Sequence, residues 1–264
     1  MVANETNMEA IQPDAGSGFW NLFRRESQLW WGTRRWIISL AVSVIGMNGL
    51  LAYVLFILPA MIEAQGETLD PWQAGLQLYF GLGFMATAIM VVIVLQDSIM
   101  TEKQTGTLQW VLSKPVSRLS YLLAKLFAHS IPIILVYILI PGGIAYLLFS
   151  IYGQSVGINF WWGIGLLLLH SIFYLILTIF MTVQFDNRML VLMLGIGSIL
   201  GGSLAVNLLG PATLWTPWPL ASLAIALAGG LGLPFLLSLS ILCTLLWCVI
   251  GLWFTTLRFN NMDL

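Results

Sequence analysis

The chain has 264 residues, of which 59% are hydrophobic and only 8% are charged, and its formal net charge at pH 7 is −1. Soluble domains carry about 25% charged residues, so a soluble chain of this composition would have too little polar surface to face water. We therefore expect one all-α integral membrane domain, and we expect no nucleic-acid partner.

The N-terminal region divides into two parts. Residues 1–17 are polar and acidic and lack the basic start and apolar core of a signal peptide, so we expect a disordered cytoplasmic tail. Residues 18–35 alternate apolar and polar side chains with a helical period. The apolar face would hold Phe19, Leu22, Phe23, Leu29 and Trp30, mostly opposite Arg24, Arg25, Ser27 and Gln28. This pattern predicts an amphipathic helix lying in the inner-leaflet interface.

Residues 36–264 contain long apolar stretches that suit membrane-spanning helices. Crossing the hydrocarbon core takes about 20 apolar residues in a helix, which pairs every backbone polar group within the segment. Six stretches qualify, at about 36–62, 73–96, 126–152, 161–183, 189–209 and 233–256. The sequence therefore predicts a membrane domain of six transmembrane helices over residues 36–264.

The basic residues predict the orientation of these spans. All ten lysines and arginines fall on one side of the six predicted spans, whereas the loops of the other side carry Glu63, Glu67 and Asp70. Cytoplasmic loops of membrane proteins are enriched in lysine and arginine. We expect a multi-pass protein of the cell membrane, inner or plasma, with both termini and residues 101–125 in the cytoplasm.

The segment 210–232 interrupts this regular pattern. It is apolar, but Pro211, Pro217 and Pro219 break it and glycines bound it. It is too short and too interrupted to form two spans. We expect a re-entrant or outer-leaflet hairpin before the last span, with its irregular backbone buried by protein.

The chemistry that is missing excludes several functions. No phosphate-binding loop of the form G-x-x-x-x-G-K-[ST] is present, so the chain cannot hydrolyse ATP by that route. His129 and His170 are the only ionisable side chains well inside the predicted spans, which disfavours an ion-coupled transporter. Cys243 and Cys248 have no metal-ligand spacing, and we expect no metal site.

The fifth predicted span carries small residues. Gly197 and Gly201 form a G-x-x-x-G pattern, which predicts a close helix contact within the subunit or with a second copy. Ser198 and His170 could be combined into a nucleophile and base, which would make the chain an intramembrane enzyme. We favour the packing interpretation.

A charged segment, residues 101–125, separates the second and third predicted spans. Gly106 predicts a turn, after which Leu108, Val111 and Leu112 share one face of a short helix that Pro115 ends. Ser117 would cap the next helix. The segment could be an ordinary cytoplasmic loop with snorkelling bases. It could also be a docking element, with its apolar face in a groove of a soluble partner.

The same segment resembles a known family. Its residues Glu102, Gly106-Thr107-Leu108, Leu112-Ser113, Pro115-Val116-Ser117-Arg118 and Tyr121-Leu122-Leu123-Ala124-Lys125 are similar to the signature of ABC-2 type transporter permeases. That signature reads roughly E…GTLE–LLS–PVSR–LLGK. Two positions depart from it, Gln109 and Ala124.

This resemblance implies a function and a site. Such permeases pair two membrane subunits with two separate ATPase subunits, which bind the ATP and magnesium, so we expect no cofactor on this chain. The coupling helix would be Thr105–Leu112, including Thr107 and Leu108. Glu102 and Arg118 would brace it, as an ion pair across the turn. The second and fifth spans would line the path, and residues 210–232 would form the outer gate.

Two functions follow as expectations. The first is the permease subunit of an ATP-driven exporter of a hydrophobic or amphipathic substrate, which is not an enzyme by itself. The second is a membrane scaffold or assembly subunit that rearranges an extracytoplasmic protein. Expected partners are the ATPase, a second permease copy or homologue, membrane lipid and an accessory extracytoplasmic protein.

Overall fold

The computed structural model describes residues 18–114, 116–153, 157–232 and 234–261, and every regular element within these residues is helical. Six helices are long and apolar enough to cross a membrane: Arg35–Glu63, Pro71–Gln104, Arg118–Ile151, Ile158–Gln184, Arg188–Trp215 and Phe235–Asn260. The prediction of six spans in an all-α fold is confirmed. The expected tail, residues 1–17, and Pro115 lie outside the described residues.

The helices follow one another in a simple order. They are α1 (Phe19–Trp31), α2 (Arg35–Ser43), η1 (Val44–Asn48), α3 (Gly49–Ala52), η2 (Tyr53–Ile57), α4 (Leu58–Glu63), α5 (Pro71–Gln104), α6 (Thr107–Leu112), α7 (Arg118–Ile133), η3 (Ile134–Leu139), α8 (Ile140–Ile151), α9 (Ile158–Gln184), α10 (Arg188–Leu209), η4 (Gly210–Trp215), α11 (Leu220–Ala228) and α12 (Pro234–Asn260). The first span runs from α2 to α4, and the third runs from α7 to α8.

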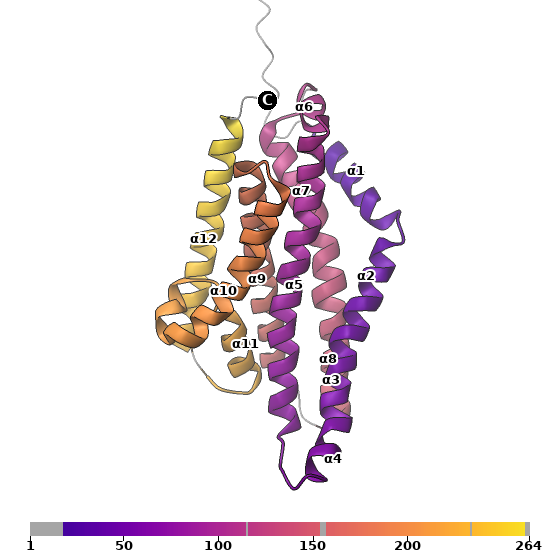
Figure 1. Cartoon of the computed structure of the whole chain (residues 1–264), viewed down its shortest axis with the longest axis vertical. Helices are drawn as coiled ribbons and strands as arrows, with labels where there is room; N and C mark the ends of the chain where they lie inside the picture. The colour runs from indigo at the N-terminus through magenta and orange to yellow at the C-terminus, as the bar shows by residue number, and fades with distance from the viewer. Residues whose placement is uncertain (1–17, 115, 154–156, 233, 262–264) are drawn as a thin grey trace, which may run out of the picture.

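The two ends of the bundle differ in charge. One end carries α1, α6, the start of α7 and the end of α12 (Figure 1). All ten lysines and arginines lie on helices or on the turns between helices at or near this end, which we call the basic end. The opposite end carries α4 and the loop with Glu67 and Asp70. The one-sided distribution of basic residues predicted from the sequence is thus present in the fold.

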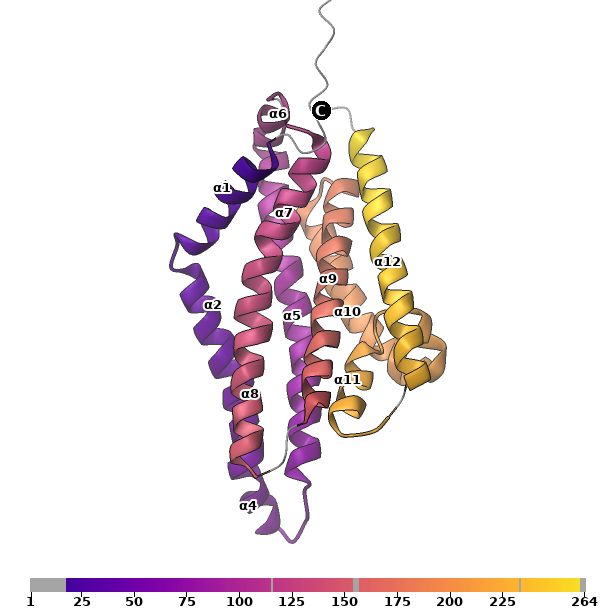
Figure 2. The same cartoon turned by 180° about the vertical axis from the view of Figure 1, so that it is seen from behind.

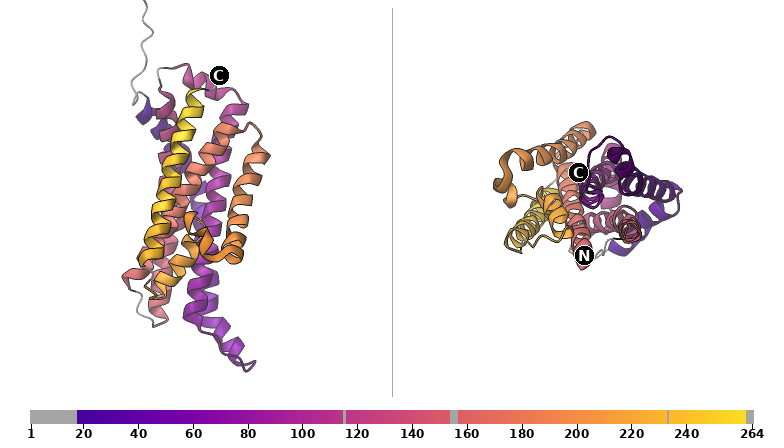
Figure 3. Two further views of the ribbon diagram at one scale, coloured as in Figure 1. Left: turned by 90° about the vertical axis from the view of Figure 1, so that its left-hand side faces the viewer. Right: turned by 90° about the horizontal axis from the view of Figure 1, so that it is seen from below.

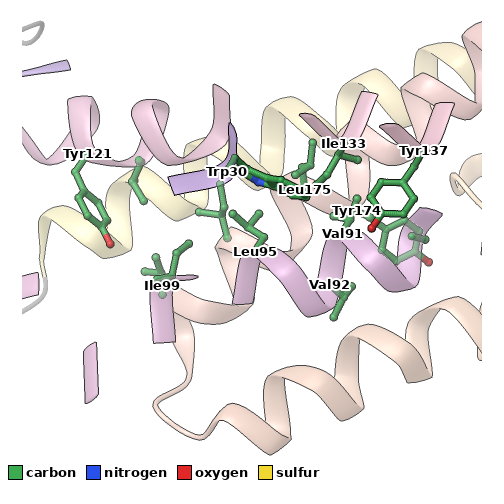
Figure 4. Packing of buried hydrophobic residues seen from close by; sticks show 14 of the residues in the cluster. Trp30, Val91, Val92, Leu95, Ile99, Tyr121, Ile133, Tyr137, Tyr174 and Leu175 are labelled. Atoms are coloured by element: carbon green, nitrogen blue, oxygen red, sulfur yellow. The ribbon is translucent and has the colours of Figure 1, made fainter. Parts of the chain in front are cut away.

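Helix α9 forms the centre of the packing. It packs along α5, α12 and α11, as the end-on view illustrates (Figure 3). The buried apolar side chains form two clusters, one in the half of the bundle toward each end. In the basic-end cluster, Trp30 of α1, Leu95 of α5 and Tyr121 of α7 come together with residues of α9 (Figure 4).

Helix α1 is amphipathic, as its sequence indicates, but it is also part of the bundle. It packs against α7, beside which it lies in the rear view (Figure 2). Trp30 is buried, whereas Leu29, which belongs to the same apolar face, is 57% exposed. The apolar face of α1 is therefore divided between the protein and the surroundings.

Two of the spans contain π-helical turns that the sequence does not indicate. They are η1 and η2 in the first span and η3 in the third. A π-turn changes the backbone hydrogen-bonding pattern and is frequent at functional sites. Here Ser43 donates a hydrogen bond of 2.8 Å to the carbonyl of Val136, which joins the first span to η3.

The segment 210–232 folds back onto the bundle. It forms η4 and α11, and α11 packs against α9 and α5 with Leu220 and Ala224 buried. Gly202 of α10 lies directly against Trp218, so only a glycine fits there. Protein covers residues 216–219 of this segment, whereas residues 211, 212 and 230–232 are exposed. Its re-entrant position in a membrane stays a prediction.

The small residues of α10 divide between two faces. Gly195 faces α5, where an added methyl would lie 2.6 Å from Val92 Cγ1. Nothing described lies within 4 Å of a methyl on Gly197 or Gly201. The G-x-x-x-G pair therefore makes no close helix contact within the described chain. The alternative, a close contact with a second copy of the chain, stays a prediction.

Candidate functional site

The site begins where α5 ends, at the tip of the basic end. Gly106 follows with φ of 72°, a left-handed conformation that glycine adopts without a steric penalty. Helix α6 starts at Thr107 and ends at Leu112. The turn at Gly106 and the short helix after it are where the sequence predicts them.

The apolar face of α6 points inward. Leu108 and Val111 are 2% and 3% exposed and belong to the basic-end cluster, and Leu112 packs against that cluster. The expectation that this face enters a groove of a soluble partner is wrong for this structure. A helix of six residues is not stable alone, so its apolar side chains are used to hold it on the bundle.

The surface that α6 presents is a different one. Its outer face, as we call it, consists of Thr105, Gly106, Gln109, Trp110 and Lys114, all of which are exposed. Trp110 is 60% exposed, and the Lys114 ammonium lies 3.6 Å from the centre of its ring. An exposed tryptophan beside a cation at the tip of a membrane protein is a strong candidate for a protein contact.

Lys103 ties the end of α5 to the end of α9. Its ammonium lies 2.7 Å from a carboxylate oxygen of Asp186 and donates to the carbonyls of Thr182 and Phe185, at 2.9 and 3.2 Å. The last carbonyls of a helix have no partner within the helix, and a lysine there satisfies them. Movement of this end of α5 would therefore be passed to α9.

Lys125 is the centre of a buried ionic cluster that joins α1, α5 and α7. Its ammonium lies 3.0 Å from Glu26 and 3.0 Å from Glu102, and it donates to the Ser98 hydroxyl at 2.7 Å. Tyr121 donates to the second oxygen of Glu102 at 2.6 Å. Lys125 is 3% exposed and Glu26 5%, so this cluster is shielded from water.

Arg118 has a different partner from the one expected. It donates to the carbonyls of Phe259 and, at 3.0 Å, Asn260, at the end of α12. Glu102 is engaged by Lys125 and Tyr121, so the ion pair between Glu102 and Arg118 is replaced by two separate contacts. The capping role expected of Ser117 is confirmed, since its oxygen accepts from the Ser120 amide at 3.0 Å.

Sequence reasoning missed Glu26, Lys103 and Lys125 as site residues. Glu26 had a usable signal, because it lies four residues after Leu22 and four before Trp30. Residues at that spacing share a helix face, so an acidic residue there stands on the apolar side of α1. Its partner comes from a helix a hundred residues later in the chain, which no local pattern reveals.

The alternative of an intramembrane enzyme gains no support from the geometry. The hydroxyl of Ser198 lies 3.4 Å from that of Tyr174, and no described contact joins it to His170. The His170 ring packs instead between the rings of Phe84 and Tyr174. Among the described residues, no group of three or more histidine, cysteine or acidic side chains could hold a metal ion.

The six long apolar helices define a multi-pass membrane protein. The model of the ABC-2 type transporter family matches residues 17–212, and the chain belongs to this family. It is therefore a membrane subunit of an ABC transporter, and members of this family normally work with an ABC ATPase partner. No curated protein matches the chain significantly.

Proposed function

We propose that this chain is the permease subunit of an ATP-driven exporter, and that a separate ATPase subunit drives it through the outer face of α6. The observation that carries this proposal is the division of α6 into an anchored face and an exposed face. Leu108 and Val111 fix the helix, whereas Trp110 is presented to a partner.

The contacts around α6 supply a route for mechanical coupling. Helix α6 follows α5 after one turn at Gly106. The end of α5 is held to α9 by Lys103, and to α1 and α7 by the cluster around Lys125. The ion pairs of Lys125 are buried and resist separation, because parting them leaves uncompensated charges. Lys103 holds α9 through its hydrogen bonds to two carbonyls, since its partner Asp186 is exposed. A push on α6 would move these helices together.

The remaining assignments rest on the family and on the composition of the spans. Two ATPase copies bind the ATP and magnesium, a second permease copy completes the membrane domain, and the basic end faces the cytoplasm of the cell. The apolar spans support a hydrophobic or amphipathic substrate over a small ion.

The experiment compares two exposed tryptophans at opposite ends. Trp110 is 60% exposed on α6, and Trp162 is 63% exposed near the start of α9. In the complex reconstituted with its ATPase, Trp110→Ala is expected to weaken ATPase binding about tenfold or more, as at interface hot spots. Trp162→Ala is expected to bind normally. If both variants bound the ATPase equally well, the outer face of α6 would not be the ATPase-binding surface.

A further inference from the structure

A cavity of about 650 Å³ lies next to the buried ionic cluster. Residues of α1, α2 and α5 form most of its wall, and Lys125 and His129 of α7 and Arg188 of α10 complete it. Its lining combines charged groups of both signs with apolar side chains such as Leu29, Ile38 and Ile93. Such a mixture, at the depth where the spans begin, suits an amphiphile.

The inner part of this cavity carries unused hydrogen-bond acceptors. Glu26 and His129 both line it and are both 5% exposed. The described contacts of Glu26 use only its Oε2 atom, and those of His129 only Nδ1, which lies 2.9 Å from the Lys125 carbonyl. A carbonyl accepts only, so Nδ1 carries the hydrogen. Nε2 of the neutral ring is then an acceptor.

The charge of this inner part is also unbalanced. Glu26 and Glu102 form their ion pairs with one shared cation, Lys125, so within these pairs one carboxylate charge is in excess. A buried charge without a counter-charge is costly. A cationic group that donates N–H bonds to Glu26 Oε1 and His129 Nε2 would compensate both deficits.

The outer part of the cavity has the reverse character. Arg35 is exposed there, and Arg188 is half-exposed and lies 2.8 Å from Asp97. Guanidinium groups bind phosphate through paired hydrogen bonds. The cavity thus presents acceptors inside and cations near its opening, next to apolar side chains that are exposed on the bundle surface.

We propose that this cavity binds the headgroup of a phospholipid of the ethanolamine type, taken from the leaflet at the basic end. Its primary ammonium meets Glu26 and His129, its phosphate meets Arg35 and Arg188, and its acyl chains lie along Ile38 and Ile93. A choline headgroup has no N–H to donate, and a glycerol headgroup has no positive charge. Binding at this site does not depend on the function proposed above.

The test is native mass spectrometry of the detergent-purified full chain with equal amounts of phosphatidylethanolamine, phosphatidylcholine and phosphatidylglycerol. The wild type is expected to retain the ethanolamine lipid preferentially. Glu26→Gln is expected to reduce this retention about tenfold, the value of a hydrogen bond to a charged group. Glu63→Gln, which removes an exposed carboxylate at the opposite end, is expected to leave it unchanged.

A second variant leaves the ionic cluster intact. Ser39→Phe adds a bulky side chain to the cavity wall without changing its charge, and it is expected to lose the same lipid. Equal retention of the three lipids by the wild type would overturn the proposal, as would unchanged retention by Ser39→Phe. A dimer that excludes lipid because a second copy fills the cavity would overturn it too.

Discussion

Lys125 shows how one residue can hold three helices at the basic end. Its ammonium contacts carboxylates from α1 and α5, and it stands on α7 itself. The sequence suggests a snorkelling base, because a lysine beside an apolar stretch ordinarily reaches the headgroups. The fold instead buries it, which the two acidic partners make possible.

Replacing Lys125 by methionine is expected to lower stability by about 3–5 kcal/mol, since Glu26 and Glu102 would be left without a counter-charge. Thermal unfolding of the purified protein measures this change, with the exposed Lys114→Met as the matched control. The triple variant Glu26→Leu/Lys125→Met/Glu102→Leu should regain most of the loss. An unfolding temperature for Lys125→Met equal to that of the wild type would refute the role of this cluster.

At the scale of elements, local signals were sufficient for part of the fold. The spans, the turn at Gly106 and the cap at Ser117 follow from hydropathy, glycine conformation and side-chain hydrogen bonding, all of which act over a few residues. These local signals did not predict which face of α6 packs against the bundle. An apolar stripe indicates burial but does not say whether the chain or a partner covers it.

The hinge at Gly106 gives an element-scale prediction. Nothing described lies within 4 Å of a methyl added there, so any effect of Gly106→Ala comes from the backbone alone. The left-handed conformation costs an alanine about 1–2 kcal/mol, and asparagine tolerates it better. Gly106→Ala is expected to reduce stimulation of the ATPase by the reconstituted permease more than Gly106→Asn. Identical stimulation by the two variants would show that this conformation is not required.

At the scale of the whole molecule, the basic end is organised by contacts between distant segments. Arg118 caps α12, Lys103 caps α9, and Lys125 binds α1. These three basic residues were visible in the sequence, but these partners were not, because the pairings join residues 79 to 142 positions apart. The charged segment thus forms the exposed tip of the basic end, and its basic residues also hold the neighbouring helices together.

Photo-crosslinking from α6 tests the central claim most directly. A photoreactive residue would replace either Trp110, on the outer face, or Leu108, which is 2% exposed. In the complex assembled with the ATPase, position 110 is expected to crosslink to the ATPase and position 108 only within the permease. Crosslinks to the ATPase from position 108, or none from position 110, would contradict docking through the outer face of α6.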